Sequence, residues 1–227
     1  MTLVAGVLAS QAQSNVYSAN VVGYINRTIV PGGATTQYSL IANHLTTGND
    51  VLSNLVQGLP VNSKVLKFNA TAQAFNTFTR VAFGAGWSPT GAGSNTLTLG
   101  EGAFVTLPNG STDTNTFVGT VFQADGVIVP PFTNTFAPGF SLQSFPVPVT
   151  LPVTNTLVNL NPALPATPSG SKLLSYNEAG QSFNTFTRVA FGSGWSPTVP
   201  TVSPGVGFFI FNAASSNRTW STTFQVQ

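Results

Sequence analysis

The residues that could carry acid–base, nucleophilic or metal chemistry are few in this chain. His44 is the single histidine, and cysteine is absent. The five carboxylates are scattered along the sequence: Asp50, Glu101, Asp113, Asp125 and Glu178. Metal sites need several convergent His, Cys, Asp or Glu side chains, which this scatter does not predict. A serine hydrolase would need His44 beside an activated serine, and the sequence has no Gly-x-Ser-x-Gly turn. We therefore expect no catalytic, metal or cofactor site.

Glycoside hydrolysis would need two carboxylates on either side of the scissile bond. An internal repeat in the chain bears on this possibility. Glu101 aligns with Val206 of the second copy, and Glu178 aligns with Ala70 of the first. Any acid pair would therefore be confined to one copy, and the sequence favours a protein that is not an enzyme.

The repeat is near-identical over one segment. Residues 75–90 recur as 183–198, and only Ala85 differs, where the second copy has Ser193. The flanking segments align more loosely in the same order, for example Gly100–Val105 with Gly205–Ile210. The sequence thus predicts two tandem units, residues 13–121 and 133–227. Their linker, 122–132, contains an Asp-Gly turn former and a Pro-Pro pair.

Each unit has the pattern of an antiparallel β protein. Runs rich in Val, Thr, Phe and Tyr alternate with Pro and Gly, and only residues 49–57 have the apolar spacing of a short helix. The predicted fold class is therefore all-β, with two tandem antiparallel β-sandwich or barrel-like domains related by internal duplication.

The duplicated segment is also the candidate contact surface. On a strand, Phe75 and Thr77 would face the core, whereas Asn76, Phe78 and Arg80 would face the other way. Two interpretations remain open: a core hairpin in which Arg80 covers Phe78 or caps a carbonyl, and a surface that binds a sugar or a neighbouring subunit. The contact-surface interpretation uses eight residues: Asn76, Phe78, Arg80, Trp87, Asn184, Phe186, Arg188 and Trp195.

Charge is scarce throughout the chain. Only 5% of the residues are charged, against about 25% in an ordinary soluble domain. The seven Lys and Arg residues form no basic stripe, so nucleic-acid binding is not expected. No apolar run approaches the roughly 18 residues of a membrane-spanning helix. A surface with so little self-repulsion is typical of proteins that pack against neighbours or a matrix.

The N-terminal residues indicate export. Residues 3–9 resemble the apolar core of a secretory signal, and Ser10-Gln11-Ala12 offers small residues for cleavage. We therefore interpret residues 1–12 as the remnant of a signal peptide, although a positively charged start is missing and an ordinary first strand is the alternative. The expected location is extracellular or at the cell surface. A strand-like stretch follows, with candidate subunit-exchange residues Val21, Val22, Tyr24, Ile25, Ile29 and Val30.

Four short segments carry a family resemblance: residues 16–26, 38–43, 86–89 and 100–105. They resemble exported, functionally uncharacterised two-repeat β proteins of Verrucomicrobia-type bacteria. The resemblance implies export and the two-copy layout, and it assigns no catalytic residue.

Two functions follow as hypotheses. The first is an extracellular structural subunit that polymerises with copies of itself into a filament or surface layer, through exchange of the N-terminal strand. The alternative is an extracellular carbohydrate-binding or adhesive module that presents the repeated Trp, Phe, Asn and Arg residues to a cell-surface or extracellular polysaccharide.

Overall fold

The computed structural model describes residues 21–84, 86–124, 131–152, 168–190, 194–198 and 201–224. The expected signal remnant, residues 1–12, and linker residues 125–130 lie outside these ranges. The described chain is nearly all β, with several antiparallel sheets, which confirms the predicted fold class at that level. A short helix, α1 (Leu52–Leu55), lies within the helical stretch expected at 49–57, and a 3-10 turn, η1 (Ala92–Ser94), comes later.

Two five-stranded sheets have the same strand order. The first runs β2 (Ser39–Ala42), β7 (Gly102–Thr106), β4 (Lys64–Asn69), β5 (Ala74–Arg80) and β6 (Trp87–Ser88). The second runs β10 (Gly139–Gln143), β16 (Phe208–Asn212), β12 (Lys172–Asn177), β13 (Ser182–Arg188) and β14 (Trp195–Ser196). Each strand of the first sheet therefore has a counterpart in the second, formed by the aligned segments of the repeat.

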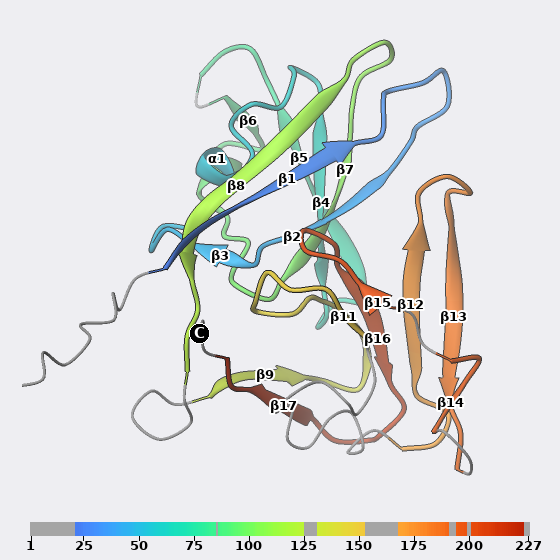
Figure 1. Ribbon diagram of the computed structural model, residues 1–227. Coiled ribbons are helices and arrows are strands. Elements are labelled where there is room, and N and C mark those ends of the chain that lie inside the picture. Colours follow the sequence, from blue (N-terminus) through green and yellow to red (C-terminus); the bar gives the residue numbers. More distant parts are fainter. Residues whose placement is uncertain are drawn as a thin grey trace, which may run out of the picture.

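Smaller antiparallel sheets complete each half. The first half contains β1 (Val22–Ile29), β8 (Asp113–Val121) and β3 (Leu45–Thr46), in the order β1-β8-β3. The second half contains β9 (Phe132–Phe136) paired with β17 (Arg218–Thr222), and β11 (Leu151–Pro152) paired with β15 (Thr201–Val202). The β1–β8 and β9–β17 ribbons lie at opposite ends of the molecule, the latter along the bottom in Figure 1.

Each half has its own apolar core. In the first, Ile29 of β1 and Phe117 of β8 pack with Val65 of β4 and Phe78 of β5, and all four are buried. In the second, Phe145, Phe208 and Trp220 form the centre, with the Phe145 and Trp220 rings stacked at 5.8 Å. Burial of large apolar side chains is the main stabilising contribution in such small sheets.

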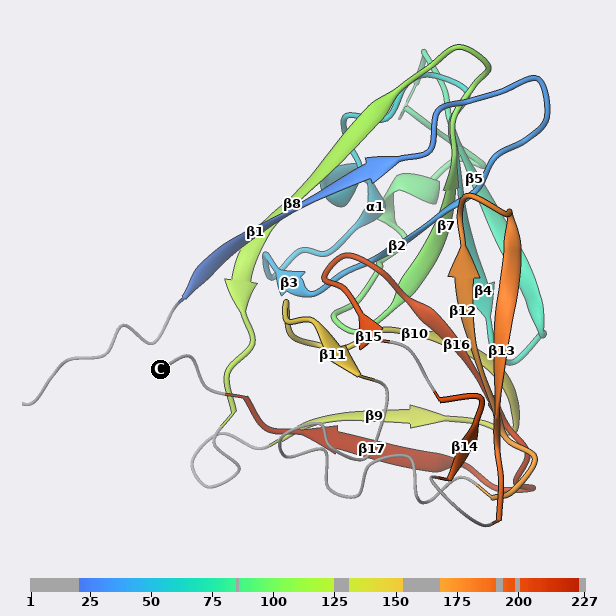
Figure 2. The same cartoon turned by 45° about the vertical axis from the view of Figure 1, so that its right-hand side comes forward.

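A third apolar cluster joins the halves. Leu40 and Phe104 of the first sheet pack with Leu142 and Phe209 of the second. Backbone hydrogen bonds also cross between the halves at matched positions. The Ala42 amide donates to the Gly205 carbonyl (2.9 Å), and the Ser144 amide donates to the Gly100 carbonyl (2.7 Å). Figure 2 shows β4 and β5 beside β12 and β13, so the two sheets meet across their second faces.

This shared face corrects the predicted orientation of β5. We expected Phe75 and Thr77 to face the core and Phe78 to face away. Phe78 is instead buried in the core of its half, whereas Phe75 is 41% exposed on the opposite face. The predicted alternation along β5 is correct, but the face assigned to the core is wrong. Both faces of this sheet are apolar, so the residue pattern alone does not distinguish them.

Candidate functional site

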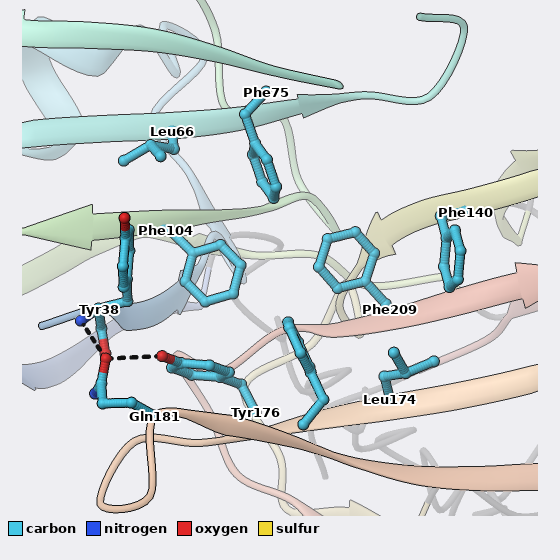
Figure 3. Close-up of a pocket in the computed structure, with 10 residues that line it drawn as sticks. Tyr38, Leu66, Phe75, Phe104, Phe140, Leu174, Tyr176, Gln181 and Phe209 are labelled. Carbon is cyan, nitrogen blue, oxygen red and sulfur yellow. Dashed lines mark hydrogen bonds between the residues drawn. The ribbon is translucent and has the colours of Figure 1, made fainter. Parts of the chain in front are cut away.

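An aromatic cleft of about 460 Å³ opens where the two sheets meet (Figure 3). Its lining residues come from both halves: Tyr38, Leu66, Phe75, Phe104, Phe140, Leu174, Tyr176, Gln181, Phe183 and Phe209. Several occupy matched positions in the repeat, such as Leu66 with Leu174 and Phe75 with Phe183. Both sheets thus contribute the same kinds of side chain to one cavity.

The rings of the cleft contact one another mainly edge to face. Phe104 and Phe209 lie nearly parallel, with centroids 6.4 Å apart, and link the two sheets. Tyr176 meets Phe104 edge-on at 4.9 Å, and Phe183 meets Phe209 edge-on at 5.7 Å. Such arrangements are the favourable ones for aromatic pairs. Phe183 nevertheless remains 42% exposed, so apolar ring surface faces solvent at the cleft.

Two glutamines clamp the sheets together in the same way on each side. Gln181 accepts a hydrogen bond from the Tyr38 amide (2.7 Å) and donates one to the Tyr38 carbonyl (3.1 Å). Gln73 makes the same two bonds to Phe140, both 2.9 Å long. Gln73 and Gln181 are the last turn residues of matched hairpins, directly before β5 and β13. Their φ angles are 51° and 48°, in the left-handed region. These four bonds fix the sheets relative to each other, so the cleft is preformed.

One end of the cleft is polar. The Tyr176 hydroxyl donates to Gln181 Oε1 (2.8 Å), and Figure 3 shows this oxygen also receiving the Tyr38 amide. Burial, followed by the charge of Glu178 and the nearby Tyr38, raises the pKa of Tyr176. The phenol therefore stays neutral at physiological pH. The remaining walls are aromatic or aliphatic, so the cleft offers apolar contact with hydrogen-bonding groups at one end.

The candidate contact residues mostly lie in the cores. Trp87 and Trp195 are buried in equivalent environments, 3% and 5% exposed, and Phe78 and Phe186 are buried beside them. These rings are buried, as the core-hairpin interpretation predicts. They therefore present no exposed face on which a sugar could stack.

Arg80 has a structural contact in this hairpin. Its Nη1 donates to the Gly86 carbonyl (2.9 Å), and its guanidinium lies 5.8 Å from the centre of the Trp87 ring, a cation–π distance. Arg188 is half-buried at the matched position. Of the predicted set, Asn76 and Asn184 are the exposed members. Binding of a partner through these two amides stays a prediction.

The candidate exchange strand is docked within its own chain. β1 pairs with β8 over its whole length, from Val22 opposite Thr120 to Ile29 opposite Asp113. Ile25 and Ile29 are buried in the first core, and Val21 and Val30 are half-buried. In the single chain this strand is therefore part of its own sheet, and its exchange with a second copy stays a prediction. Val22 and Tyr24 point outward, 68% and 74% exposed.

The titratable residues that the structure describes do not converge. His44 is fully buried, and its Nδ1 lies 2.9 Å from the Val147 carbonyl of the other half. Burial lowers its pKa to about 4, opposed in part by the Val147 and Val206 carbonyls, so the ring is neutral at physiological pH. Glu101 pairs with Lys67 (3.0 Å), and Glu178 pairs with Arg27. Within the described residues, no group of three His, Cys, Asp or Glu side chains could hold a metal ion.

The repeat contained a signal for the residues that line the cleft. Aromatic or aliphatic residues at matched positions of both copies, such as Phe75 with Phe183, were visible in the sequence. What the sequence lacked was the information that the two sheets face each other, so these positions were assigned to separate cores.

No protein-family model, no curated protein and no solved structure matches this chain. The resemblance to exported two-repeat proteins therefore stays an expectation. Within the described residues, no helix is long and apolar enough to cross a membrane.

Proposed function

We propose that this chain is an exported, non-catalytic binding protein whose aromatic cleft takes a small, apolar, ring-containing ligand. The observation that carries the proposal is the preformed cleft itself, with exposed rings of Phe75 and Phe183 at its walls. Its volume falls in the range of small-molecule sites, about 300 to 1,000 Å³. Exposed apolar surface gathered in one concave place is typical of a binding site.

The lining favours an apolar guest over a polysaccharide. Its polar groups are gathered around Gln181 and the tyrosine hydroxyls, so a sugar bound deeper would leave its own hydroxyls without partners. A flat ring system can lie against Phe104 and Phe209 and place one polar substituent near the Tyr176 hydroxyl. Descent of the two sheets from one duplicated unit, which their shared strand order supports, would explain why both halves supply equivalent walls.

The test uses N-phenyl-1-naphthylamine, a neutral fluorescent probe of apolar sites. We expect saturable binding with one site per chain and a dissociation constant in the micromolar range, on the order of 1 to 100 μM. Replacing both Phe75 and Phe183 by Ser removes two ring contacts. Burying a whole ring is worth about 1.5 to 3 kcal/mol, and a ligand covers only the exposed part of these two rings, so affinity should fall by about tenfold or more.

The matched control is Phe83→Ser. Phe83 belongs to the same duplicated segment, is 87% exposed and does not line the cleft, so its removal should leave probe binding unchanged. The absence of saturable binding, or equal affinity in the Phe75→Ser/Phe183→Ser variant and the native chain, would contradict the proposal.

A second candidate function is self-assembly, and β1 favours it. β1 is the last strand in the order β1-β8-β3, so one of its backbone edges has no strand partner among the described residues. Its outward side chains Val22 and Tyr24 adjoin Val118 of β8, which is 53% exposed. An open strand edge beside an apolar patch is a template for pairing with another chain. The proposed partner is a different strand edge of a second copy, so that the contact repeats head to tail into a filament or surface layer.

Point changes test this better than truncation. Deleting residues 1–26 would also remove Ile25 from the first core, so loss of assembly would be confused with loss of stability. Val22→Lys/Tyr24→Lys adds two charges to the outer face of β1 without touching that core. We expect this variant to stay monomeric by sedimentation velocity while the native chain assembles. Val61→Lys, at an exposed site elsewhere, is the control. A native chain that stays monomeric at high concentration would refute self-assembly.

A further inference from the structure

A second cleft, of about 510 Å³, lies at a position where the two halves differ in charge. It is bordered by Ala70 in the β4–β5 hairpin, Glu101 before β7, and Phe132 and Asn134 of β9. Unlike the aromatic cleft, it is lined largely by hydroxyl and amide side chains. The site is therefore separate from the proposed apolar one and has a different chemistry.

The equivalent position in the other half is filled by an ion pair. Ala70 follows Asn69 in its hairpin, as Glu178 follows Asn177 in the matched hairpin β12–β13. The Glu178 carboxylate pairs with Arg27 of β1 and accepts a hydrogen bond from the Leu40 amide (2.9 Å). Both side chains of the pair are largely buried, at 17% and 22% exposure.

Strand register identifies the residue that matches Arg27. Ile29 pairs with Asp113 at the start of β8, and Phe136 pairs with Arg218 at the start of β17. Two residues before Ile29 is Arg27, and two residues before Phe136 is Asn134. Asn134 of the second half and Ala70 of the first-half hairpin therefore occupy the positions that Arg27 and Glu178 occupy on the opposite side.

The neighbouring glycines support the same match. A Cβ at Gly205 would meet the Ile25 and Arg27 side chains, at 3.1 Å and 3.5 Å. A Cβ at the aligned Gly100 would meet the Phe132 ring, at 3.2 Å. The two sides therefore have the same walls, and replacing a long charged pair by a methyl group and an amide opens the space between them.

The groups left in the opening are amides, hydroxyls and one lysine-paired carboxylate, and they lie beside an aromatic ring. Asn134 Nδ2 donates to Gln143 Oε1, which leaves Asn134 Oδ1 and Gln143 Nε2 for another partner. The Ser141 hydroxyl has no hydrogen bond to the described residues. Glu101 Oε2 is held by the Thr98 amide (2.7 Å) and by Lys67 (3.0 Å), so its charge is compensated and its Oε1 remains an acceptor. The Phe132 ring supplies an apolar wall.

We propose that this cleft, between Ala70 and Asn134, binds a neutral carbohydrate. Amide and hydroxyl groups can donate to and accept from sugar hydroxyls, and a ring can pack on the apolar face of a pyranose. The volume also suits a ligand of one or two sugar units, within the usual range of small-molecule sites. The guanidinium and carboxylate that exclude such a ligand from the opposite side are absent here.

The test fills the cleft with the residues of the other half. Ala70→Glu/Asn134→Arg rebuilds the Arg27–Glu178 pair at the matched position, in a hairpin of the same kind. Cellobiose, maltose and N,N′-diacetylchitobiose are titrated against the native chain and the variant, with binding followed by NMR chemical shifts. We expect at least one of the three to bind the native chain saturably at a single site, and the filled variant to bind it at least about tenfold more weakly.

Three comparisons keep the result interpretable. Ala72→Glu, on the exposed part of the same hairpin, adds the same charge outside the cleft and should bind like the native chain. Binding of N-phenyl-1-naphthylamine should be the same in the filled variant, because the aromatic cleft is untouched. If the double variant does not fold by circular dichroism, Ala70→Glu alone serves, with weaker sugar binding expected. No saturable binding of the three sugars below about 10 mM, or equal binding by native and filled chains, would overturn the proposal.

Discussion

His44 makes stability depend on pH in a way that can be calculated from the structure. The ring is fully buried at the contact between the halves, and burial lowers its pKa from 6.5 to about 4. Its Nδ1 donates to the Val147 carbonyl, at 2.9 Å. Protonation in the folded protein would place a charge in this apolar site, so the folded state resists it.

The sign follows from which state binds the proton. Between pH 6.5 and about 4 the unfolded chain holds a proton on His44 and the folded chain does not, so acidification favours unfolding. The free energy of unfolding should therefore fall by about 1.4 kcal/mol per pH unit in this window. The full drop is about 3 kcal/mol, because the pKa is lowered by roughly 2.5 pH units.

The assay is urea denaturation followed by tryptophan fluorescence at pH 7.5, 6.5, 5.5 and 5.0. These values lie above the ordinary pKa of the carboxylates, about 3.9 to 4.3, so His44 dominates the change. His44→Leu removes the titrating group and should give a nearly flat profile over the same range. A native profile that is flat from pH 6.5 to 5.0, or a His44→Leu profile as steep as the native one, would refute the burial of a neutral His44.

Three further changes test the contacts that hold the fold. Gln181→Asn keeps an amide that tolerates positive φ but cannot reach Tyr38, so loss of two hydrogen bonds should lower the free energy of unfolding by about 1 to 3 kcal/mol; equal urea midpoints would contradict the clamp. Trp87→Ala should cost about 3 to 5 kcal/mol, since the ring is 3% exposed, and a cost below about 1 kcal/mol would contradict its burial. Gly32→Ala would place a Cβ 1.8 Å from the Pro108 carbonyl oxygen, so calorimetry should show a melting temperature lower by several degrees, about 2 to 4 °C for each kcal/mol lost.

Much of the architecture could be predicted because the two copies of the repeat can be compared with each other. Agreement between residues 75–90 and 183–198 located matching hairpins, and Val, Thr and Phe alternation located their strands. The direction of that alternation was not predictable. Phe75 and Phe78 are the same residue type, and the polar residues Asn76 and Arg80 on the face of Phe78 indicated an outward face, although Phe78 is buried.

The site was harder to predict than the strands, because it depends on how the halves meet. Phe104 and Phe209 come from aligned strands, and nothing local in their sequence indicates that they face each other across a cleft. The clamps of Gln73 and Gln181 are contacts between residues more than sixty positions apart. The sequence also does not indicate that β1 pairs with β8, because all five strands of the first sheet lie between them in the chain.

The exposed rings of the cleft make the proposed binding directly observable. In a complex with N-phenyl-1-naphthylamine, intermolecular nuclear Overhauser effects should connect the aromatic protons of the probe with the methyl groups of Leu66 and Leu174. These leucines line the cleft from opposite sheets, so contact with both at one probe position places the ligand between the halves. Leu97, which is fully buried in the first core, should show no such effect. Effects at Leu66 and Leu174 are the predicted result; their absence in a saturated sample, or effects only at residues outside the cleft, would contradict the account.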